Sequence, residues 1–268
     1  MLEIAEIRIY PVKGLRGISL DHAVVEPWGL EHDRRWMVID AQGKFVTQRQ
    51  IPAMAVVGAE LLPDGLRLTA PGLDPLGIAI PGADAETLAV VVWDDDVAAR
   101  AAGPGADRWI SQALGTACRL VHMSDPALAR PVDPDFADAG DRVSFADGFP
   151  LLVTNVASLD DLNGRLPRRA SMDRFRSNLV VRGAEPWDED AWRRLRVGAI
   201  QFDAVKDCAR CAVPTVDQET GVKDEDAEPM RTLARFRRKA QGRIIFGQNL
   251  IPRGVGTLRV GDPVHPSP

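Results

Sequence analysis

Short apolar runs, separated by glycine and proline, fill the first half of the chain and constrain its fold more than any other feature. Ile4–Val12 alternates in polarity and Leu88–Trp93 is rich in valine, as β-strands are. Two further pairs of runs flank glycine-containing turns and predict hairpins: Trp36–Asp40 with Lys44–Gln48, and Leu61–Leu62 with Leu66–Thr69. Strands this short and this interrupted favour a β-barrel or sandwich over a doubly wound parallel sheet.

The rest of the chain mixes strands with a few helices. Helices are predicted over Gly105–Leu114, over Ser158–Leu166 with Ser158 as the N-cap, and over Pro229–Arg238 with proline in the first turn. Strands are predicted over Leu151–Thr154, Asn178–Val181, Ala199–Val205 and Thr257–Val260, the last of which should end the fold before a proline-rich tail. Val121–Asp141, rich in proline and aspartate, predicts a loop between two parts of the chain. The sequence therefore predicts an α+β, β-rich protein.

Composition excludes several classes of protein. The net charge of −5 gives no overall electrostatic footprint for nucleic acid. No apolar run approaches the roughly 20 residues that a membrane-spanning helix needs, and the N-terminus lacks the pattern of a signal peptide. Three cysteines, an odd number, argue against a secreted disulfide framework. We therefore expect a cytoplasmic protein without a membrane span.

The stretch Cys208-Ala209-Arg210-Cys211 is the strongest chemical signal in the chain. A thiolate is a soft metal ligand and a strong nucleophile, and the arginine between the two thiols favours the ionised form. Two cysteines cannot complete a four-ligand zinc site, and neither Cys118 nor any histidine stands at ligand spacing. The residues alone leave open a redox pair, a persulfide carrier, a single-thiolate metal site and two small buried residues at a corner.

Three basic clusters indicate an anionic ligand. Lys13 and Arg16 lie where the first strand breaks at glycines, and Arg34 opens the predicted hairpin at Trp36. The third cluster is Arg174–Asn178, at the start of a predicted strand. Each cluster alone is typical of a solvated face. Together with a reactive thiol, they favour a phosphate-bearing ligand whose other end meets sulfur, because lysine and arginine bind phosphate through charge-assisted hydrogen bonds.

These segments resemble a known family along nearly the whole chain. The chain is similar to proteins in which a MOSC N-terminal β-barrel domain precedes a MOSC domain, the group that contains the mitochondrial amidoxime-reducing component and its bacterial relatives. The resemblance rests on eight segments: Ile9–Gly14, Asp33–Asp40, Phe45–Gln50, Ser158–Asn163, Arg174–Asn178, Cys208–Gly221, Phe246–Asn249 and Val260–Val264. It implies a MOSC N-terminal β-barrel-like domain over residues 1–120, packed against a MOSC β-barrel domain over residues 121–268.

The resemblance also implies a molybdenum cofactor, a Mo-molybdopterin with a terminal phosphate and one protein cysteine as metal ligand. The ligand falls at Cys211. The implied cofactor-binding residues are Lys13, Gly14, Arg34, Ala146, Asp147, Arg176, Asn178, Ala209, Arg210 and Cys211, with Lys13 and Arg34 at the phosphate and Arg176 and Asn178 at the pterin. Two positions depart from the family, because Gly14 and Ala146 stand where serine is common. A hydroxyl contact at Gly14 becomes a backbone N–H at best.

The activity that the resemblance implies is two-electron reduction of N-hydroxylated or N-oxide compounds, with Cys211 and Asp147 as the catalytic residues. A different class stays open, because the MOSC domain also ends molybdenum-cofactor sulfurases. In that alternative, Cys211 carries a persulfide or delivers cofactor to another enzyme. A third possibility is a pterin-binding module without turnover.

The implied partners are a small N-oxygenated substrate and a separate electron-transfer protein, either a ferredoxin-like or a cytochrome-like carrier served by a flavin reductase. The sequence has no cysteine cluster for an iron–sulfur centre and no pyridoxal-phosphate domain, so neither cofactor is expected. Nucleic acid is not expected as a partner. The basic residues of Pro229–Arg238 and Lys239 predict a docking face for an acidic carrier.

Overall fold

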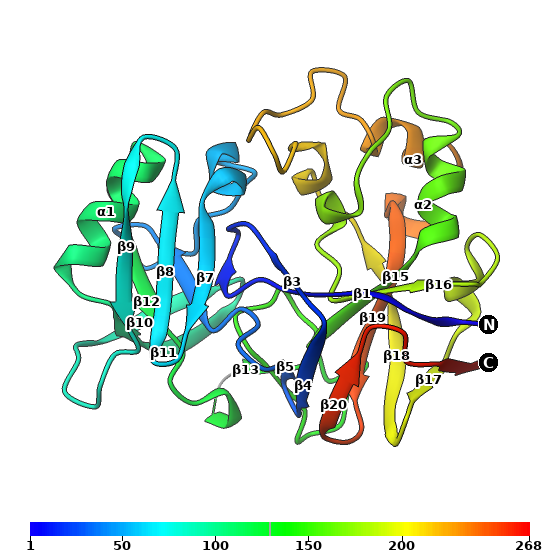
Figure 1. Ribbon diagram of the computed structural model, residues 1–268, viewed down its shortest axis with the longest axis horizontal. Helices are drawn as coiled ribbons and strands as arrows, with labels where there is room; N and C mark the ends of the chain where they lie inside the picture. The colour runs from blue at the N-terminus through cyan, green and yellow to red at the C-terminus, as the bar shows by residue number, and fades with distance from the viewer. Residues whose placement is uncertain (129) are drawn as a thin grey trace.

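The computed structural model describes residues 1–128 and 130–268, and strands dominate it (Figure 1). Two lobes lie side by side, one carrying strands β7 to β12 and helix α1, the other carrying β15 to β20 with helices α2 and α3 (Figure 1). The three α-helices of the described residues are α1 (Pro104–Leu114), α2 (Val156–Asn163) and α3 (Met230–Phe236). The predicted β-rich α+β class is confirmed.

An eight-stranded sheet forms the frame of one lobe. Its order is β21 (Val264–Ser267), β17 (Arg194–Val197), β18 (Ile200–Ala209), β19 (Ile245–Pro252), β15 (Leu151–Asn155), β16 (Leu179–Arg182), β1 (Glu3–Ile9) and β3 (Ile18–Leu20). Only β15 and β16 run parallel in it. Alternate residues of these strands, such as Ile7, Val153 and Phe202, point into one buried apolar cluster. The sheet spans the predicted domain division at residue 120, because β1 pairs with β16.

The other lobe is built from two smaller sheets and a helix. A five-stranded sheet has the order β10 (Thr87–Val92), β11 (Asp95–Ala101), β12 (Arg119–His122), β6 (Trp36–Ile39) and β2 (Val12–Lys13), and a three-stranded sheet joins β7 (Gly58–Leu62), β8 (Gly65–Ala70) and β9 (Leu73–Ala79). Helix α1 contributes Ile110 and Leu114 to the apolar core between them. This lobe therefore has its own core, separate from that of the eight-stranded sheet.

Smaller elements complete the chain. The remaining strands are β4 (His22–Glu26), β5 (Gly29–Leu30) and β20 (Gly256–Arg259) in one sheet, and β13 (Arg130–Pro131) with β14 (Arg142–Val143) in another. Short 3-10 turns occupy Pro52–Val56, Pro126–Leu128, Met172–Phe175, Asp188–Ala191, Val213–Thr215 and Ala240–Gly242. Within the described ranges, no helix is both long and apolar enough to cross a bilayer.

Several predicted elements are confirmed, and three are wrong in detail. The hairpin around Pro63–Gly65 forms, with Leu62 opposite Gly65. The predicted hairpin at Trp36 is shorter than expected. Lys44–Gln48 forms isolated bridges instead of a strand, with Phe45 antiparallel to Ile39 of β6 and the amide of Val46 donating to the carbonyl of Val38 at 2.9 Å. The chain after β20 is not a tail, because β21 pairs with β17 at the sheet edge. Proline is tolerated there because an edge strand leaves one side of its backbone unpaired.

The N-cap prediction for the second helix was also wrong. Helix α2 begins at Val156, and the side chain of Asn155 caps it by accepting a hydrogen bond from the amide of Ala157 at 3.1 Å. Ser158 lies inside the helix and is fully buried, where its hydroxyl donates to Glu189 Oε2 at 2.7 Å. A serine that has a buried acceptor to satisfy can stand in a helix interior, which sequence spacing alone does not reveal.

Glu189 makes stability pH-dependent. Its side chain is 0% exposed, its Oε1 has no hydrogen-bond partner among the described residues, and burial raises its pKa. The folded protein thus holds this proton more tightly than the unfolded chain, and the stabilisation is lost as the pH rises through the raised pKa. We expect the free energy of unfolding of Glu189→Gln to rise relative to that of the wild type as the pH increases. The change at pH 8 should be about 1–3 kcal/mol, or roughly 2–12 °C in Tm. Thermal unfolding of both proteins at pH 5 and pH 8 measures this, and a difference that does not grow with pH would contradict it.

Candidate functional site

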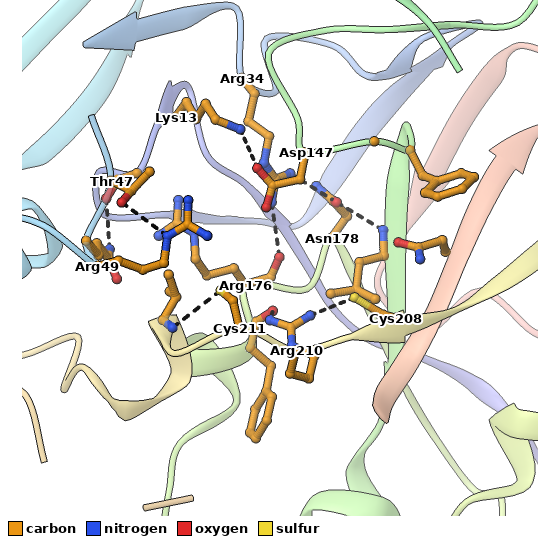
Figure 2. A pocket seen from close by; sticks show the side chains of 18 of the residues that line it. Lys13, Arg34, Thr47, Arg49, Asp147, Arg176, Asn178, Cys208, Arg210 and Cys211 are labelled. Carbon is orange, nitrogen blue, oxygen red and sulfur yellow. Dashed lines mark hydrogen bonds and ion pairs between the residues drawn. The ribbon is translucent and has the colours of Figure 1, made fainter. Parts of the chain in front are cut away.

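A cavity of about 130 Å³ lies between the two lobes and collects side chains from distant parts of the sequence (Figure 2). Strand β2 and the segment after it contribute one wall, and the end of β18 with its following loop contributes another. All ten predicted cofactor-binding residues are described, and eight of them line this cavity: Lys13, Gly14, Arg34, Asp147, Arg176, Asn178, Arg210 and Cys211. Residues from opposite ends of the chain are thus brought to one place.

Two predicted residues, Ala146 and Ala209, are described but do not line the cavity. Ala146 is buried in an apolar cluster with Val143 and Ile251, and its carbonyl accepts a hydrogen bond from Arg130 at 2.6 Å. Ala209 is the exposed last residue of β18. The cofactor contacts predicted for these two residues stay a prediction.

Lys13 and Asp147 form an ion pair at the cavity wall, with 2.5 Å between Nζ and Oδ1. The lysine side chain is only 7% exposed, whereas the aspartate side chain is exposed. Burial lowers the pKa of Lys13, and Asp147 offsets part of that effect. Loss of water would raise the pKa of Asp147, but Lys13 and Arg34 more than offset it, so this pKa lies well below its ordinary value. Asp147 is therefore ionised at neutral pH and available as a hydrogen-bond acceptor.

Arg34 is fixed by a buried carboxylate. Its Nη1 donates to Asp33, whose side chain is 2% exposed and whose other oxygen accepts the amide of Tyr10 at 2.7 Å. The guanidinium also lies over the Tyr10 ring, 4.6 Å from its centroid. Burial would lower the pKa of Arg34, but Asp33 and Tyr10 outweigh it and raise the pKa. Arg34 is thus a permanent positive charge with a fixed orientation.

Arg176 leaves one buried N–H group unused. It stands in the left-handed region at φ 56°, where it ends a 3-10 turn. Its guanidinium lies 4.1 Å from the Tyr10 ring centroid, and Nη1 donates to the carbonyl of Leu15 at 2.8 Å. Its Nη2 is buried and has no partner among the described residues. Burial lowers its pKa to about 10, so it remains a cation at neutral pH and can accept an anionic partner.

The two thiols lie on the same cavity wall in different settings. Cys208, half-buried, accepts a hydrogen bond from Arg210 Nη1 at 2.9 Å. Arg210 Nη2 donates to the carbonyl of Phe175 at 2.7 Å, while Arg210 Nε is buried without a partner in the described structure. Cys211 is exposed, and among the described residues its sulfur accepts one hydrogen bond, from the amide of Val213 at 3.5 Å. Cys211 is thus the thiol that is free to bind a ligand.

Asn178 also has a structural role. Its side-chain oxygen accepts from Arg34 and from the amide of Leu152, each at 3.2 Å, and its amide donates to the carbonyl of Arg8 at 3.1 Å. The side chain thereby ties β1, β15 and β16 together at the cavity. Its predicted contact to a pterin stays a prediction.

Sequence reasoning missed two arginines at the site. Arg130, 5% exposed, donates to the carbonyls of Ala146 and Asp147 and pairs with Asp95 at 2.7 Å, so it fixes the loop that presents Asp147. It lies in Val121–Asp141, where the loop-like composition gives no signal for a buried cation. Arg49 lines the cavity itself. It is part of Phe45–Gln50, a segment that supports the family resemblance without a residue role.

The donor set fits a phosphate-bearing group with hydrogen-bond acceptors and a soft metal. The unpartnered N–H groups of Arg176 and Arg210 need acceptors, and Lys13 and Arg34 supply positive charge. A single exposed thiol offers one soft ligand. Among the described residues, no group of three or more histidine, cysteine or acidic side chains could hold a metal ion by itself. A metal at this site would therefore need further ligands beyond those that the described residues provide.

Comparison with known proteins identifies the two domains of the chain and its relatives. Residues 1–117 match the family model of the MOSC N-terminal beta barrel domain, and residues 140–265 match that of the MOSC domain. Mitochondrial amidoxime-reducing component 1 of Mus musculus is 35% identical over 98% of this chain and 81% of the mouse protein. Mitochondrial amidoxime reducing component 2 of Bos taurus and component 1 of Homo sapiens are each 34% identical over 98% of this chain and 82% of the relative.

Proposed function

We propose that this chain, which belongs to the family of the mitochondrial amidoxime-reducing components with their MOSC N-terminal and MOSC domains, is a molybdenum-cofactor-dependent reductase of N-hydroxylated or N-oxide compounds. The observation that carries the proposal is the exposed thiol of Cys211 in a cavity with two unpartnered guanidinium N–H groups. Such a cavity suits a ligand that combines a soft metal with an anionic, acceptor-rich body.

The residues divide the work of holding such a cofactor. Lys13 and Arg34 would bind its phosphate, the free N–H groups of Arg176 and Arg210 would bind its pterin, and Cys211 would ligate the metal. The cofactor, when bound, supplies a centre for two-electron removal of an oxygen atom from the substrate. The net reaction consumes an N-hydroxylated compound, two electrons and two protons, and yields the reduced nitrogen compound and water.

Asp147 would orient the substrate. Its carboxylate is ionised and exposed at the cavity, while Lys13 and Arg130 hold the loop that carries it. An ionised carboxylate accepts hydrogen bonds, so it can bind the amino group of an amidoxime and point the N–O bond into the cavity. We therefore propose Asp147 as the second catalytic residue beside Cys211.

Electrons would come from another protein, as the sequence predicts, and part of the basic charge on the helix predicted to dock it is paired. Arg231 pairs with Glu228 and Asp226, Arg237 pairs with Asp190, and Lys239 pairs with Asp207. Pairs like these reduce the charge that would attract an acidic carrier, whereas Arg235 and Arg238 are exposed and form no ion pair with an acid among the described residues. The carrier itself stays a proposal, and α3 alone does not identify its docking face.

A single preparation tests the proposed function. Protein made in a host that synthesises molybdenum cofactor should hold about one molybdenum and one phosphate-terminated pterin per chain. It should reduce benzamidoxime with reduced viologen and be inactive with NADH alone, since the sequence has no dinucleotide-binding G-x-G-x-x-G and no iron–sulfur cysteine cluster. Metal analysis and product chromatography measure both. Protein that stays free of molybdenum in such a host would contradict the proposal.

The carrier alternative has one observation in its favour, the exposure of Cys211, which would let a second protein reach the sulfur. Mass spectrometry after incubation with a cysteine desulfurase and cysteine distinguishes the two functions. A persulfide on Cys211, in protein that contains molybdenum but reduces no N-hydroxylated compound, would establish the carrier function instead.

A further inference from the structure

A cation–aromatic pair stands at the cavity, apart from the residues assigned to the cofactor. The guanidinium of Arg49 lies over the ring of Trp93, 5.0 Å from its centroid, and Trp93 packs against Phe45 with 5.1 Å between ring centroids. Arg49 lines the same cavity as Cys211, and Figure 2 shows both among the side chains around it. Arg49 is therefore placed where a substrate entering toward Cys211 can meet it, while Trp93 contacts Arg49 without lining the cavity.

Trp93 occupies a backbone position that disfavours tryptophan. It is the first residue of the two-residue turn between β10 and β11, with φ at 59°, and Val92 pairs with Asp95 across that turn. Glycine, asparagine or aspartate usually stands in such a turn, because a bulky side chain is strained at positive φ. The indole is also 43% exposed. A half-exposed tryptophan in a strained position, stacked on an arginine at a cavity, indicates a function for that arginine.

Arg49 differs from Lys13 and Arg34 in forming no ion pair with an acid among the described residues, and it differs from Arg176 and Arg210 in being exposed. Lys13 pairs with Asp147, and Arg34 pairs with Asp33. In the described structure, the hydrogen bond of the Arg49 guanidinium is the one from Nε to Thr47 Oγ1 at 3.4 Å, which leaves both terminal nitrogens without a partner. A guanidinium held by one face on an indole presents those two nitrogens as a fork, the geometry that binds a carboxylate through two parallel hydrogen bonds.

We propose that Arg49, positioned by Trp93, makes this site selective for N-hydroxylated substrates that carry a carboxylate. The proposal rests on the proposed reductase function and adds the substrate class. Arg49 and Asp147 would then recognise opposite ends of one substrate, the carboxylate at Arg49 and the amino group of the N-hydroxylated end at Asp147. Both side chains line the cavity, and the charge of Arg49 contributes to the low pKa of Asp147, so the two groups act on each other across it.

The test compares benzamidoxime with 4-carboxybenzamidoxime on molybdenum-loaded protein. The wild type should show a higher kcat/KM for the carboxylated compound, and Arg49→Gln should lower the ratio of the two kcat/KM values by about 10- to 100-fold, mainly through KM. Trp93→Asn, in which asparagine tolerates the positive φ, should lower the ratio less. Arg67→Gln is the matched control, because Arg67 is an exposed arginine on β8 outside the cavity, and the ratio should stay as in the wild type.

A binding measurement separates this proposal from the function on which it rests. Calorimetric titration of 4-carboxybenzamidoxime into oxidised protein needs no turnover, and Arg49→Gln should weaken that binding by the same factor. If neither compound is reduced but the titration depends on Arg49, the reductase function fails while carboxylate recognition holds. An unchanged ratio in Arg49→Gln, a wild type without preference, or loss of molybdenum from the variant would each overturn the assignment of Arg49 to the substrate.

Discussion

Cys211→Ser is expected to abolish reduction of N-hydroxylated compounds, with a residual rate below about one hundredth of the wild type. Serine is a harder and far less acidic ligand than cysteine, so it cannot supply the soft anionic donor that the exposed Cys211 offers. X-ray absorption at the molybdenum edge should show one sulfur ligand fewer in the variant. The rate is measured with reduced viologen and benzamidoxime, normalised to molybdenum content.

Cys208→Ser is the matched control for this prediction. Cys208 lies three residues earlier in the same motif and lines the same cavity, but its sulfur accepts a hydrogen bond from Arg210, a task that a serine oxygen can also perform. This variant should retain at least about a tenth of the activity and an unchanged number of sulfur ligands. Normal activity in Cys211→Ser, or equal losses in both variants, would remove Cys211 from the metal.

Arg34→Ala is expected to weaken cofactor binding and also to destabilise the fold. The loss in free energy of unfolding should be about 3–5 kcal/mol, because the substitution leaves the buried carboxylate of Asp33 without its cation. For a chain of this size the loss corresponds to roughly 6–20 °C in Tm. Lys13→Ala should be milder toward the fold, since its partner Asp147 is exposed and can be solvated. Differential scanning calorimetry of cofactor-free protein measures the stability of both variants.

Asp33→Asn combined with Arg34→Ala shows whether the buried charge is the cause. The double variant has no unpaired carboxylate, so it should recover part of the Tm lost in Arg34→Ala, a positive coupling between neighbouring residues. The amide of Tyr10 now donates to Asp33 Oδ1, and the side-chain oxygen of the introduced asparagine can accept the same hydrogen bond, which limits other losses. If the double variant is less stable than Arg34→Ala, the loss comes from the contacts of Arg34 with Tyr10 and Arg176 rather than from Asp33.

Lys13 and Arg34 also show how far the sequence predicts the site. The family resemblance implies a phosphate contact for both, and both line the cavity. Their different roles in stability could not be foreseen, because the difference lies in how deeply each acid partner is buried. Burial depends on which distant segments pack over a residue, and neighbours in sequence do not determine it.

The same distinction runs through the fold. Predictions that depended on local chemistry, such as the hairpin at Pro63–Gly65 and helix α1, are confirmed. Those that failed depended on distant partners. Lys44–Gln48 has strand-like residues, but β2 already pairs with Trp36 and Met37 of β6, so the predicted hairpin shortens to a bridge between Phe45 and Ile39. The final residues have the composition of a tail, but they form a strand because the edge of β17 is available for pairing. Ser158 has the residue type of an N-cap, but its hydroxyl donates a hydrogen bond to the distant Glu189 instead.

The position of β1 sets the order in which this protein can mature. Glu3–Ile9 pairs with β16, so the first strand to leave the ribosome waits for Leu179–Arg182 before it gains that hydrogen-bonded neighbour. The cavity closes later still, because Lys13 and Cys211 line it together. Contacts this distant in sequence form slowly, and we expect any bound cofactor to enter only after synthesis of nearly the whole chain. A nascent chain that stalls before Cys211 would lack part of the cavity wall and would leave the positive charges of Lys13 and Arg34 exposed to solvent.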